Sequence, residues 1–183
     1  AEKRRIRLPI YWTSWLTIAD LDGDGSSEFV WNTQGRVYAV GTDGRIRWTY
    51  AFVPGGLPGS PDAYSGVANA QVYDLDGDGV PEVVTTSLSE LVILDGRTGL
   101  PRASHPSAGL HGSFYTAQNV QLVDADSDGH VDILATNVSE PTGLAYLMLR
   151  GAPNDWLPGP AIHPQVNFVN GDFSGNGHVE FNA

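Results

Sequence analysis

The chain has 183 residues, with 21 Asp and Glu against 10 Lys and Arg, and a formal net charge of -11. This acidity argues against a nucleic-acid partner, because a phosphate backbone is bound by concentrated positive charge. The absence of cysteine excludes disulfides and zinc held by thiolates. No apolar run approaches the roughly 20 residues that a membrane-spanning helix needs. With 41% hydrophobic and 10% aromatic residues, the composition predicts a folded chain rather than a disordered acidic one.

Residues 1–12 are expected to form an N-terminal strand, after which the chain enters a unit that repeats. The first unit covers about 13–60. Its segments rich in β-branched and aromatic residues, separated by Gly-rich turns, predict strands rather than helices. These segments are 15–18, 29–31, 36–40 and 45–50.

Two further units and part of a fourth follow, at about 61–113, 114–160 and 161–183. Corresponding strand segments lie at 69–73, 83–84, 91–94, 100–102, 119–123, 133–135 and 145–149. No window shows a sustained helical period of apolar residues, so we expect an all-β protein. Four short strands in each unit of about 50 residues are typical of a β-propeller blade. We therefore predict one repeat domain over 1–183 with about three and a half blades, as a partial propeller or an open repeat array.

An acidic nonapeptide recurs once in each unit, between the first and second predicted strands. The four copies begin at residues 20, 74, 124 and 172 and contain 14 of the 21 acidic residues. Each has Asp at position 1, oxygen-bearing side chains at positions 3 and 5, Gly at position 6 and a carboxylate at position 9. One such segment is a common Asp/Gly turn, but four copies in register indicate a shared function. We refer to them as loops 1 to 4.

Bare carboxylates at this spacing repel one another, and a hard divalent cation with oxygen ligands removes that repulsion. Calcium accepts six to eight oxygen ligands, whereas magnesium prefers fewer protein ligands and more water. An EF-hand places its closing Glu at position 12 between two helices, which does not fit these loops. We predict up to four Ca²⁺ ions, held by the side chains of positions 1, 3, 5 and 9 and the backbone carbonyl of position 7. The candidate ligands are Asp20, Asp22, Asp24, Ser26, Glu28, Asp74, Asp76, Asp78, Val80, Glu82, Asp124, Asp126, Asp128, His130, Asp132, Asp172, Ser174, Asn176, His178 and Glu180. The fourth site should be the weakest, because Ser174 and Asn176 replace two carboxylates.

At these four loops the chain resembles the FG-GAP/VCBS repeat family, whose calcium-loop blades also occur in integrin α-subunit propellers. The segments 36–48 and 91–100 also look like strand–turn–strand motifs of quinoprotein-type propellers. The resemblance implies a secreted or cell-surface propeller that is stabilised by calcium and used for adhesion, display or carbohydrate contact. The quinoprotein likeness concerns shape and implies no quinone cofactor.

No catalytic constellation is evident in the sequence. There is no HExxH, GxSxG, P-loop or GxGxxG motif, and most acidic residues belong to the loops. His130 and His178 occupy position 7 of loops, and His105 falls in a stretch expected to be loop-like. We therefore expect a chain that is not an enzyme and carries no catalytic residue.

Three roles remain open from the sequence. The first is a structural or adhesive extracellular module, whose N-terminal strand completes the half-finished fourth unit of another copy and so builds oligomers or fibres. The second is an accessory or partial domain of a secreted carbohydrate-active enzyme. The third is a propeller that binds a protein or glycan ligand. Trp156 is the main candidate for sugar stacking, whereas Trp15, Trp31 and Trp48 lie in predicted strands and are expected to pack in the core.

Overall fold

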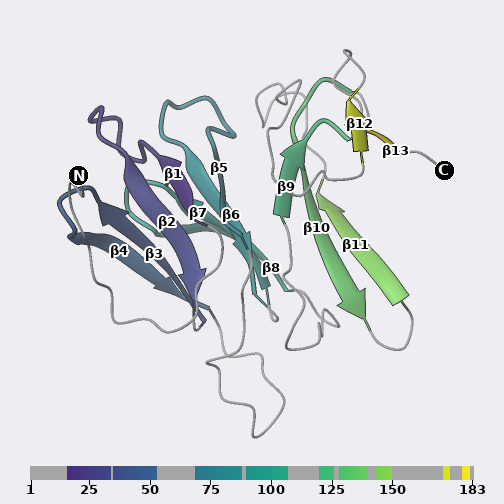
Figure 1. Ribbon diagram of the computed structural model, residues 1–183, viewed down its shortest axis with the longest axis horizontal. Coiled ribbons are helices and arrows are strands. Elements are labelled where there is room, and N and C mark those ends of the chain that lie inside the picture. The colour runs from purple at the N-terminus through teal and green to yellow at the C-terminus, as the bar shows by residue number, and fades with distance from the viewer. Residues whose placement is uncertain are drawn as a thin grey trace, which may run out of the picture.

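The computed structural model describes residues 16–33, 35–52, 69–87, 90–106, 120–125, 128–139, 143–149, 171–173 and 179–181. All regular secondary structure in these ranges is β, as the sequence predicts (Figure 1). The strands are β1 (Thr17–Ala19), β2 (Glu28–Thr33), β3 (Arg36–Gly41), β4 (Ile46–Ala51), β5 (Gln71–Tyr73), β6 (Glu82–Thr86), β7 (Glu90–Asp95), β8 (Pro101–Pro106), β9 (Val120–Val123), β10 (Asp132–Ser139), β11 (Gly143–Leu149), β12 (Gly171–Phe173) and β13 (Val179–Phe181).

These strands form four antiparallel sheets, and each sheet takes its strands in chain order. Sheet 1 is β1-β2-β3-β4, sheet 2 is β5-β6-β7-β8, sheet 3 is β9-β10-β11, and sheet 4 is β12-β13. The prediction of four-stranded units is confirmed for the first two repeats. Three strands are described in the third repeat and two in the fourth, and the described strands do not close into a ring.

Strand register repeats from one sheet to the next around the acidic loops. In sheets 1, 2 and 3, the position-9 carboxylate pairs with the residue that ends the first strand. The pairs are Ala19↔Glu28, Tyr73↔Glu82 and Val123↔Asp132. Sheet 4 differs by one position, because Asp172 itself lies in β12 and pairs with Glu180 in β13. The pairing of the third and fourth strands is also irregular at equivalent points, at Ala39/Val40 in sheet 1 and Ile93/Leu94 in sheet 2.

The first three sheets stand side by side and bury two hydrophobic cores between them (Figure 1). All five residues of β6 are buried, as expected for a strand covered on both faces. The core between sheets 1 and 2 includes Leu21, Val30, Val37, Ala39, Trp48, Phe52, Ala70, Val83, Val92 and Leu94. The core between sheets 2 and 3 includes Leu75, Val84, Leu91, Ile93, Val120, Leu122, Val131, Ile133 and Ala135.

The first strands of successive sheets are also neighbours, since β1 contacts β5 and β5 contacts β9. Side chains join them through hydrogen bonds to the backbone. The Thr17 hydroxyl donates to the Ala70 carbonyl at 2.6 Å. The Val120 N–H donates to the Asn69 side-chain oxygen at 2.9 Å, in a buried position. Apolar packing and these polar contacts together hold the first three repeats against one another.

Several expectations need correction or lie outside the described ranges. His105 is not in a loop, because Pro101–Pro106 forms β8 and pairs with β7. Strands predicted at 83–84 and 100–102 are longer in the structure, because pairing with β7 extends them. The N-terminal strand at 1–12, and with it the predicted contact between copies, falls outside the described residues, as do the predicted repeat boundaries. The described residues contain no helix long and apolar enough to cross a membrane.

Candidate metal-binding loops

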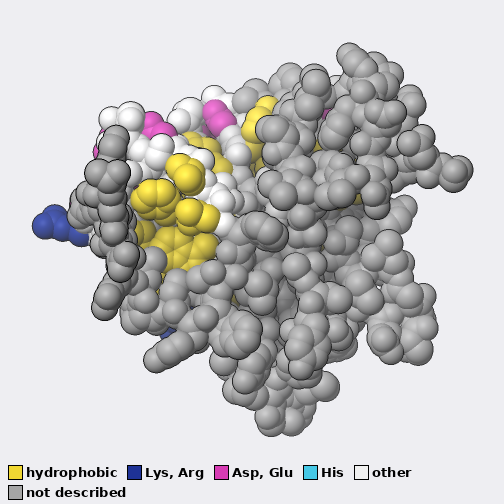
Figure 2. Space-filling model, viewed as in Figure 1, with side chains coloured by type: hydrophobic (Ala, Val, Ile, Leu, Met, Phe, Trp, Pro, Cys, Tyr) yellow, Lys and Arg dark blue, Asp and Glu magenta, His cyan; other side chains and the backbone are white. Residues whose placement is uncertain are grey.

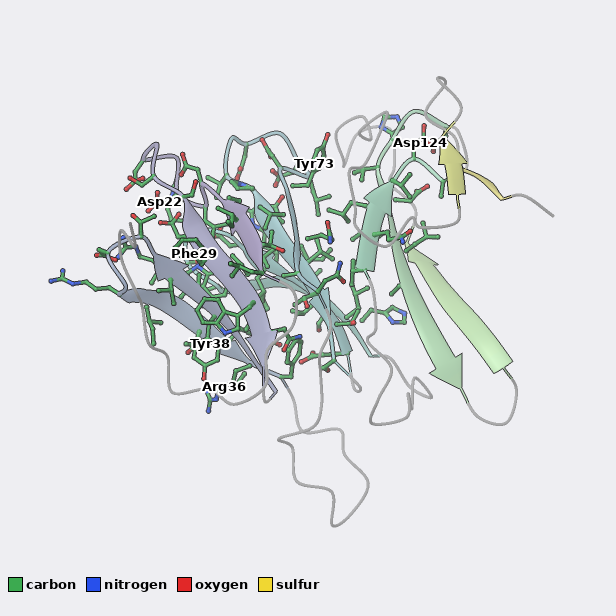
Figure 3. The ribbon with its side chains drawn as sticks, viewed as in Figure 1. Asp22, Phe29, Arg36, Tyr38, Tyr73 and Asp124 are labelled. Carbon is green, nitrogen blue, oxygen red and sulfur yellow. The ribbon has the colours of Figure 1, made fainter. Side chains whose placement is uncertain are left out.

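Loops 1, 2 and 3 connect the first and second strands of their sheets, and their described residues lie at the same end of these sheets (Figure 1). Figure 3 shows Asp22 of loop 1 and Asp124 of loop 3 at the same end of their sheets. Acidic side chains gather at that end on the face seen in Figure 2, beside hydrophobic side chains that lie over sheet 1. Chemically equivalent groups are thus brought to one edge by the repeated strand order.

Position 1 organises loops 1, 2 and 3 by accepting backbone hydrogen bonds. In loop 1, the two Asp20 carboxylate oxygens accept from Gly23 N–H at 2.8 Å and from Gly25 N–H at 2.9 Å. Loop 2 repeats these bonds at 2.8 and 3.0 Å, with Asp74, Gly77 and Gly79. In loop 3, Asp124 accepts from Gly129 at 3.0 Å. The position-6 glycines have φ of +84°, +83° and +90°, at Gly25, Gly79 and Gly129. That left-handed conformation explains why the sequence places Gly there.

Position 9 is buried, and one of its oxygens closes the loop. Glu28 accepts from Leu21 N–H at 3.1 Å, and Glu82 accepts from Leu75 N–H at 2.8 Å. Asp132 accepts from Ala125 N–H at 2.9 Å. Since Leu21 and Leu75 are buried in the two inter-sheet cores, loops 1 and 2 are anchored directly to the packing between sheets.

The remaining carboxylate oxygens of these loops differ in their surroundings. Glu28 Oε1 and Glu82 Oε1 are buried and accept no hydrogen bond, and the same holds for Asp124 Oδ1 in loop 3. Both glutamate side chains are only 2% exposed. Glu82 Oε1 has the Arg102 guanidinium as its ion-pair partner, with Nη1 at 2.8 Å, whereas Glu28 Oε1 has Arg47 Nε only at 3.8 Å. A buried carboxylate oxygen without a hydrogen bond is costly, so Glu28 Oε1 and Asp124 Oδ1 fit a bound cation that they would ligate.

Predicted ligands converge in the two loops that are described completely. Ligand oxygens of Asp20, Asp22 and Glu28 lie within 4.8 Å of one another in loop 1. In loop 2, the corresponding group is Asp74, Asp76 and Asp78. Asp24 and Glu82 do not belong to these two groups, although each occupies a predicted ligand position.

The other predicted ligands are placed to different extents. In loops 1 to 3, the position-5 carboxylate accepts a hydrogen bond from the backbone N–H of position 7. Asp24 accepts from Ser26 at 2.7 Å, and Asp78 accepts from Val80 at 2.7 Å. Asp128 accepts from His130 at 2.8 Å. Ligation by the position-7 carbonyls themselves stays a prediction. In loop 4, Asp172 and Glu180 lie in strands. Asp126, Ser174, Asn176 and His178 lie outside the described residues.

Two arginines that were not predicted from the sequence lie near loops 1 and 2. Each comes from the fourth strand of the same repeat as its loop. Arg102 in β8 lies 2.6 Å from Asp76, 3.0 Å from Asp78 and 2.8 Å from Glu82. Arg47 in β4 lies 3.8 Å from Glu28 and has a closer partner, Asp43, at 3.1 Å. Both arginines are the second residue of their strand. An arginine at the same position of the fourth strand in two repeats was the sequence signal that could have pointed to them.

Burial and hydrogen bonding shift the acidity of the loop carboxyls in opposite directions. The hydrogen bond from Arg102 lowers the pKa of Asp78, and the bond from Gly25 lowers the pKa of Asp20. Burial raises the pKa of Glu28 and raises that of Glu82 to about 7. Without a cation, burial therefore shifts both position-9 glutamates towards protonation, and the pKa of Glu82 reaches about 7.

This difference predicts a pH dependence that calcium reverses. In chelator, the raised pKa of Glu82 contributes stability that is complete below its unfolded value of 4.5 and is lost as pH rises towards about 7. Metal ligands must be deprotonated, so in excess calcium the stability should instead rise over the same pH window. Thermal unfolding of the wild type and Glu82→Gln between pH 5 and 8 tests this. The substitution should flatten the slope in chelator, and an identical wild-type slope with and without calcium would contradict the prediction.

No protein-family model matches the chain, and no curated protein matches it. The fold is similar to the crystal structure of the V. cholerae biofilm matrix protein Bap1, with a TM-score of 0.51 and 17% identity. That match covers 84% of this chain and 24% of Bap1, so the chain spans about a quarter of that protein. BBS1N, solved in complex with ARL6DN and soaked with lead, aligns with a TM-score of 0.48 and 10% identity, over 82% of this chain and 44% of BBS1N. The Bap1 match supports the β-rich repeat fold, and the resemblance to FG-GAP/VCBS repeats stays a prediction.

Proposed function

We propose that this chain is a calcium-binding repeat module of a β-propeller with a structural or adhesive role outside the cell. The observation that carries the proposal is the repeated loop, in which buried carboxylate oxygens accept no hydrogen bond. Glu28 Oε1, Glu82 Oε1 and Asp124 Oδ1 occur in three loops that share their backbone hydrogen bonds. Local turn formation accounts for those hydrogen bonds but leaves Glu28 Oε1 and Asp124 Oδ1 without one, while Glu82 Oε1 is neutralised by the cationic Arg102.

The donor set favours calcium among the divalent cations. Every side-chain ligand proposed for loops 1 to 3 is a carboxylate, and such oxygen-rich sets suit hard cations. Each loop also offers a backbone carbonyl at position 7, so protein oxygens could supply most of a six- to eight-fold shell. Magnesium usually retains several waters and is held by one or two carboxylates, which makes it the poorer fit.

Two observations support a propeller as the larger architecture. Successive sheets bury a core between their faces, and the first strands of successive sheets are neighbours. Blades arranged around a central channel have both properties. The extracellular structural role is supported by the fold-level similarity to Bap1, described as a biofilm matrix protein, and by the absence of catalytic motifs from the sequence.

A calcium titration by calorimetry tests the metal sites directly. The wild type is expected to bind several calcium ions, and Asp20→Asn and Asp74→Asn should each remove one binding event, because each weakens one loop at position 1. Asp62→Asn is the matched control, since it removes one carboxylate outside the four nonapeptides. Magnesium at the same concentration should compete weakly. The proposal fails if millimolar calcium gives no binding, or if both loop substitutions leave the stoichiometry unchanged.

A further inference from the structure

Among the described residues, Arg102 is the only arginine that forms ion pairs with several carboxylates of one loop. Its Nη1 atom lies 2.6 Å from Asp76 Oδ2 and 2.8 Å from Glu82 Oε1, and its Nη2 atom lies 3.0 Å from Asp78 Oδ2. These carboxylates stand at positions 3, 9 and 5 of the loop. One guanidinium thus contacts three of the four side chains that are proposed to hold calcium there.

The equivalent arginine of the first repeat leaves its loop largely open. Arg47 is 3.8 Å from Glu28 and 3.1 Å from Asp43, and within the described residues it forms no ion pair with Asp22 or Asp24. Two residues opposite the position-9 glutamates explain the difference. Gly41 pairs with Glu28, whereas Asp95 pairs with Glu82. Asp95 adds a fourth carboxylate beside loop 2 and lies 3.1 Å from Arg102 Nη2.

A guanidinium and a calcium ion cannot share these oxygens without conflict. Arginine has only donors and cannot ligate a metal, while calcium needs six to eight oxygens at about 2.3–2.6 Å. The positive charge of Arg102 would also repel a divalent cation held by the same carboxylates. The side chain is 31% exposed, so it has solvent on one side into which it can turn.

We propose that Arg102 is an internal counter-ion of loop 2, which calcium must displace from Asp76, Asp78 and Glu82. This inference rests on the proposed calcium sites and adds a regulation to one of them. Loop 2 exchanges one cation for another, so it binds calcium more weakly than loop 1, and its carboxylates stay neutralised when calcium is scarce. Asp95 is the group to which the displaced guanidinium remains paired.

Calcium titration of Arg102→Gln tests the exchange. The event that disappears in Asp74→Asn identifies loop 2, and its affinity should rise about tenfold in Arg102→Gln, a size usual for coupling between two bound groups. In chelator, the same variant should melt at a lower temperature than the wild type, because its loop carboxylates lose their counter-ion. In the double variant with Asp74→Asn, the gain in affinity should vanish. Arg45→Gln is the charge-matched control, since its side chain is 84% exposed and its ion-pair partner, Asp43, lies outside the loops.

Other outcomes separate this inference from the proposed calcium sites. A loop 2 affinity that is unchanged or weaker in Arg102→Gln, with normal binding elsewhere, overturns the counter-ion role alone. Weaker binding would mean that Arg102 holds the ligands in place. No calcium binding by the wild type or by any variant overturns both proposals.

Arg102→Lys provides a second measurement should the Gln variant fold poorly. A lysine retains the charge but lacks the planar fork, so its loop 2 affinity should lie between those of the wild type and Arg102→Gln, and an affinity at or below that of the wild type contradicts the exchange.

Discussion

In calcium at about a hundredfold excess over the dissociation constant, the free energy of unfolding should exceed that in chelator by about 2.7 kcal/mol for each filled loop. The reason is mass action, since the loop carboxylates converge only in the folded chain. For a protein of this length, each filled loop should raise the melting temperature by roughly 5 to 10 °C. Loops 1 and 2 also anchor Leu21 and Leu75 in the inter-sheet cores, so the stabilisation should reach the whole packed unit.

Thermal unfolding of Glu82→Gln measures the share of one loop. Glutamine keeps the shape and the acceptor for Leu75 N–H but carries no charge for a metal. In calcium the variant should melt lower than the wild type by the contribution of a single site. In chelator at pH 7 it should be as stable or slightly more stable, because it removes a buried carboxyl whose pKa is raised to about 7. Asp62→Asn, which removes a carboxylate outside the nonapeptides, should change neither value by much. Equal melting of the wild type in calcium and in chelator would contradict the account.

The strands and loops could be predicted because the sequence repeats, so that the units of one chain can be compared with one another. Trp31 and Trp48 fall at strand positions that the sequence assigned to the core, and the structure leaves them only 4% and 8% exposed. Gly at position 6 is typical of a sharp turn, and its φ is positive in loops 1, 2 and 3. Both inferences rest on local periodicity or local backbone sterics, which one sequence expresses fully.

The parts that sequence reasoning missed depend on residues that are distant along the chain. Arg102 reaches Asp76 across 26 positions, and only the strand order β5-β6-β7-β8 brings the two together. Asn32 is an apparently ordinary polar residue within β2, yet it is fully buried and donates to the Thr86 carbonyl of sheet 2 at 3.1 Å. Its partner is fixed by how two sheets face one another. His105 was misplaced for the same reason, because pairing with β7 extends β8 through a stretch with weak strand propensity.

Trp48→Ala should be among the most destabilising single substitutions in the chain, at about 3–5 kcal/mol. The indole is buried in the core between sheets 1 and 2, and its Nε1–H donates to the Gly96 carbonyl at 2.7 Å. Gly99, which has a φ of +69°, lies so close that an added Cβ would stand 2.5 Å from the ring. Trp48 therefore holds the turn after β7 against sheet 1, and its removal opens a cavity between two repeats.

A substitution series separates the contributions of the ring and the hydrogen bond. Trp48→Phe keeps an aromatic ring but leaves the Gly96 carbonyl without this donor, so it should cost about 1–3 kcal/mol, less than Trp48→Ala. Thr49→Ala, on the exposed side of the same strand, should stay within about 0.5 kcal/mol of the wild type. Urea denaturation should give the same ordering in calcium and in chelator, because Trp48 contacts no loop carboxylate directly. A loss below about 1 kcal/mol for Trp48→Ala would show that this contact contributes little to the packing of the first two repeats, and would return Trp48 to the candidates for ligand stacking.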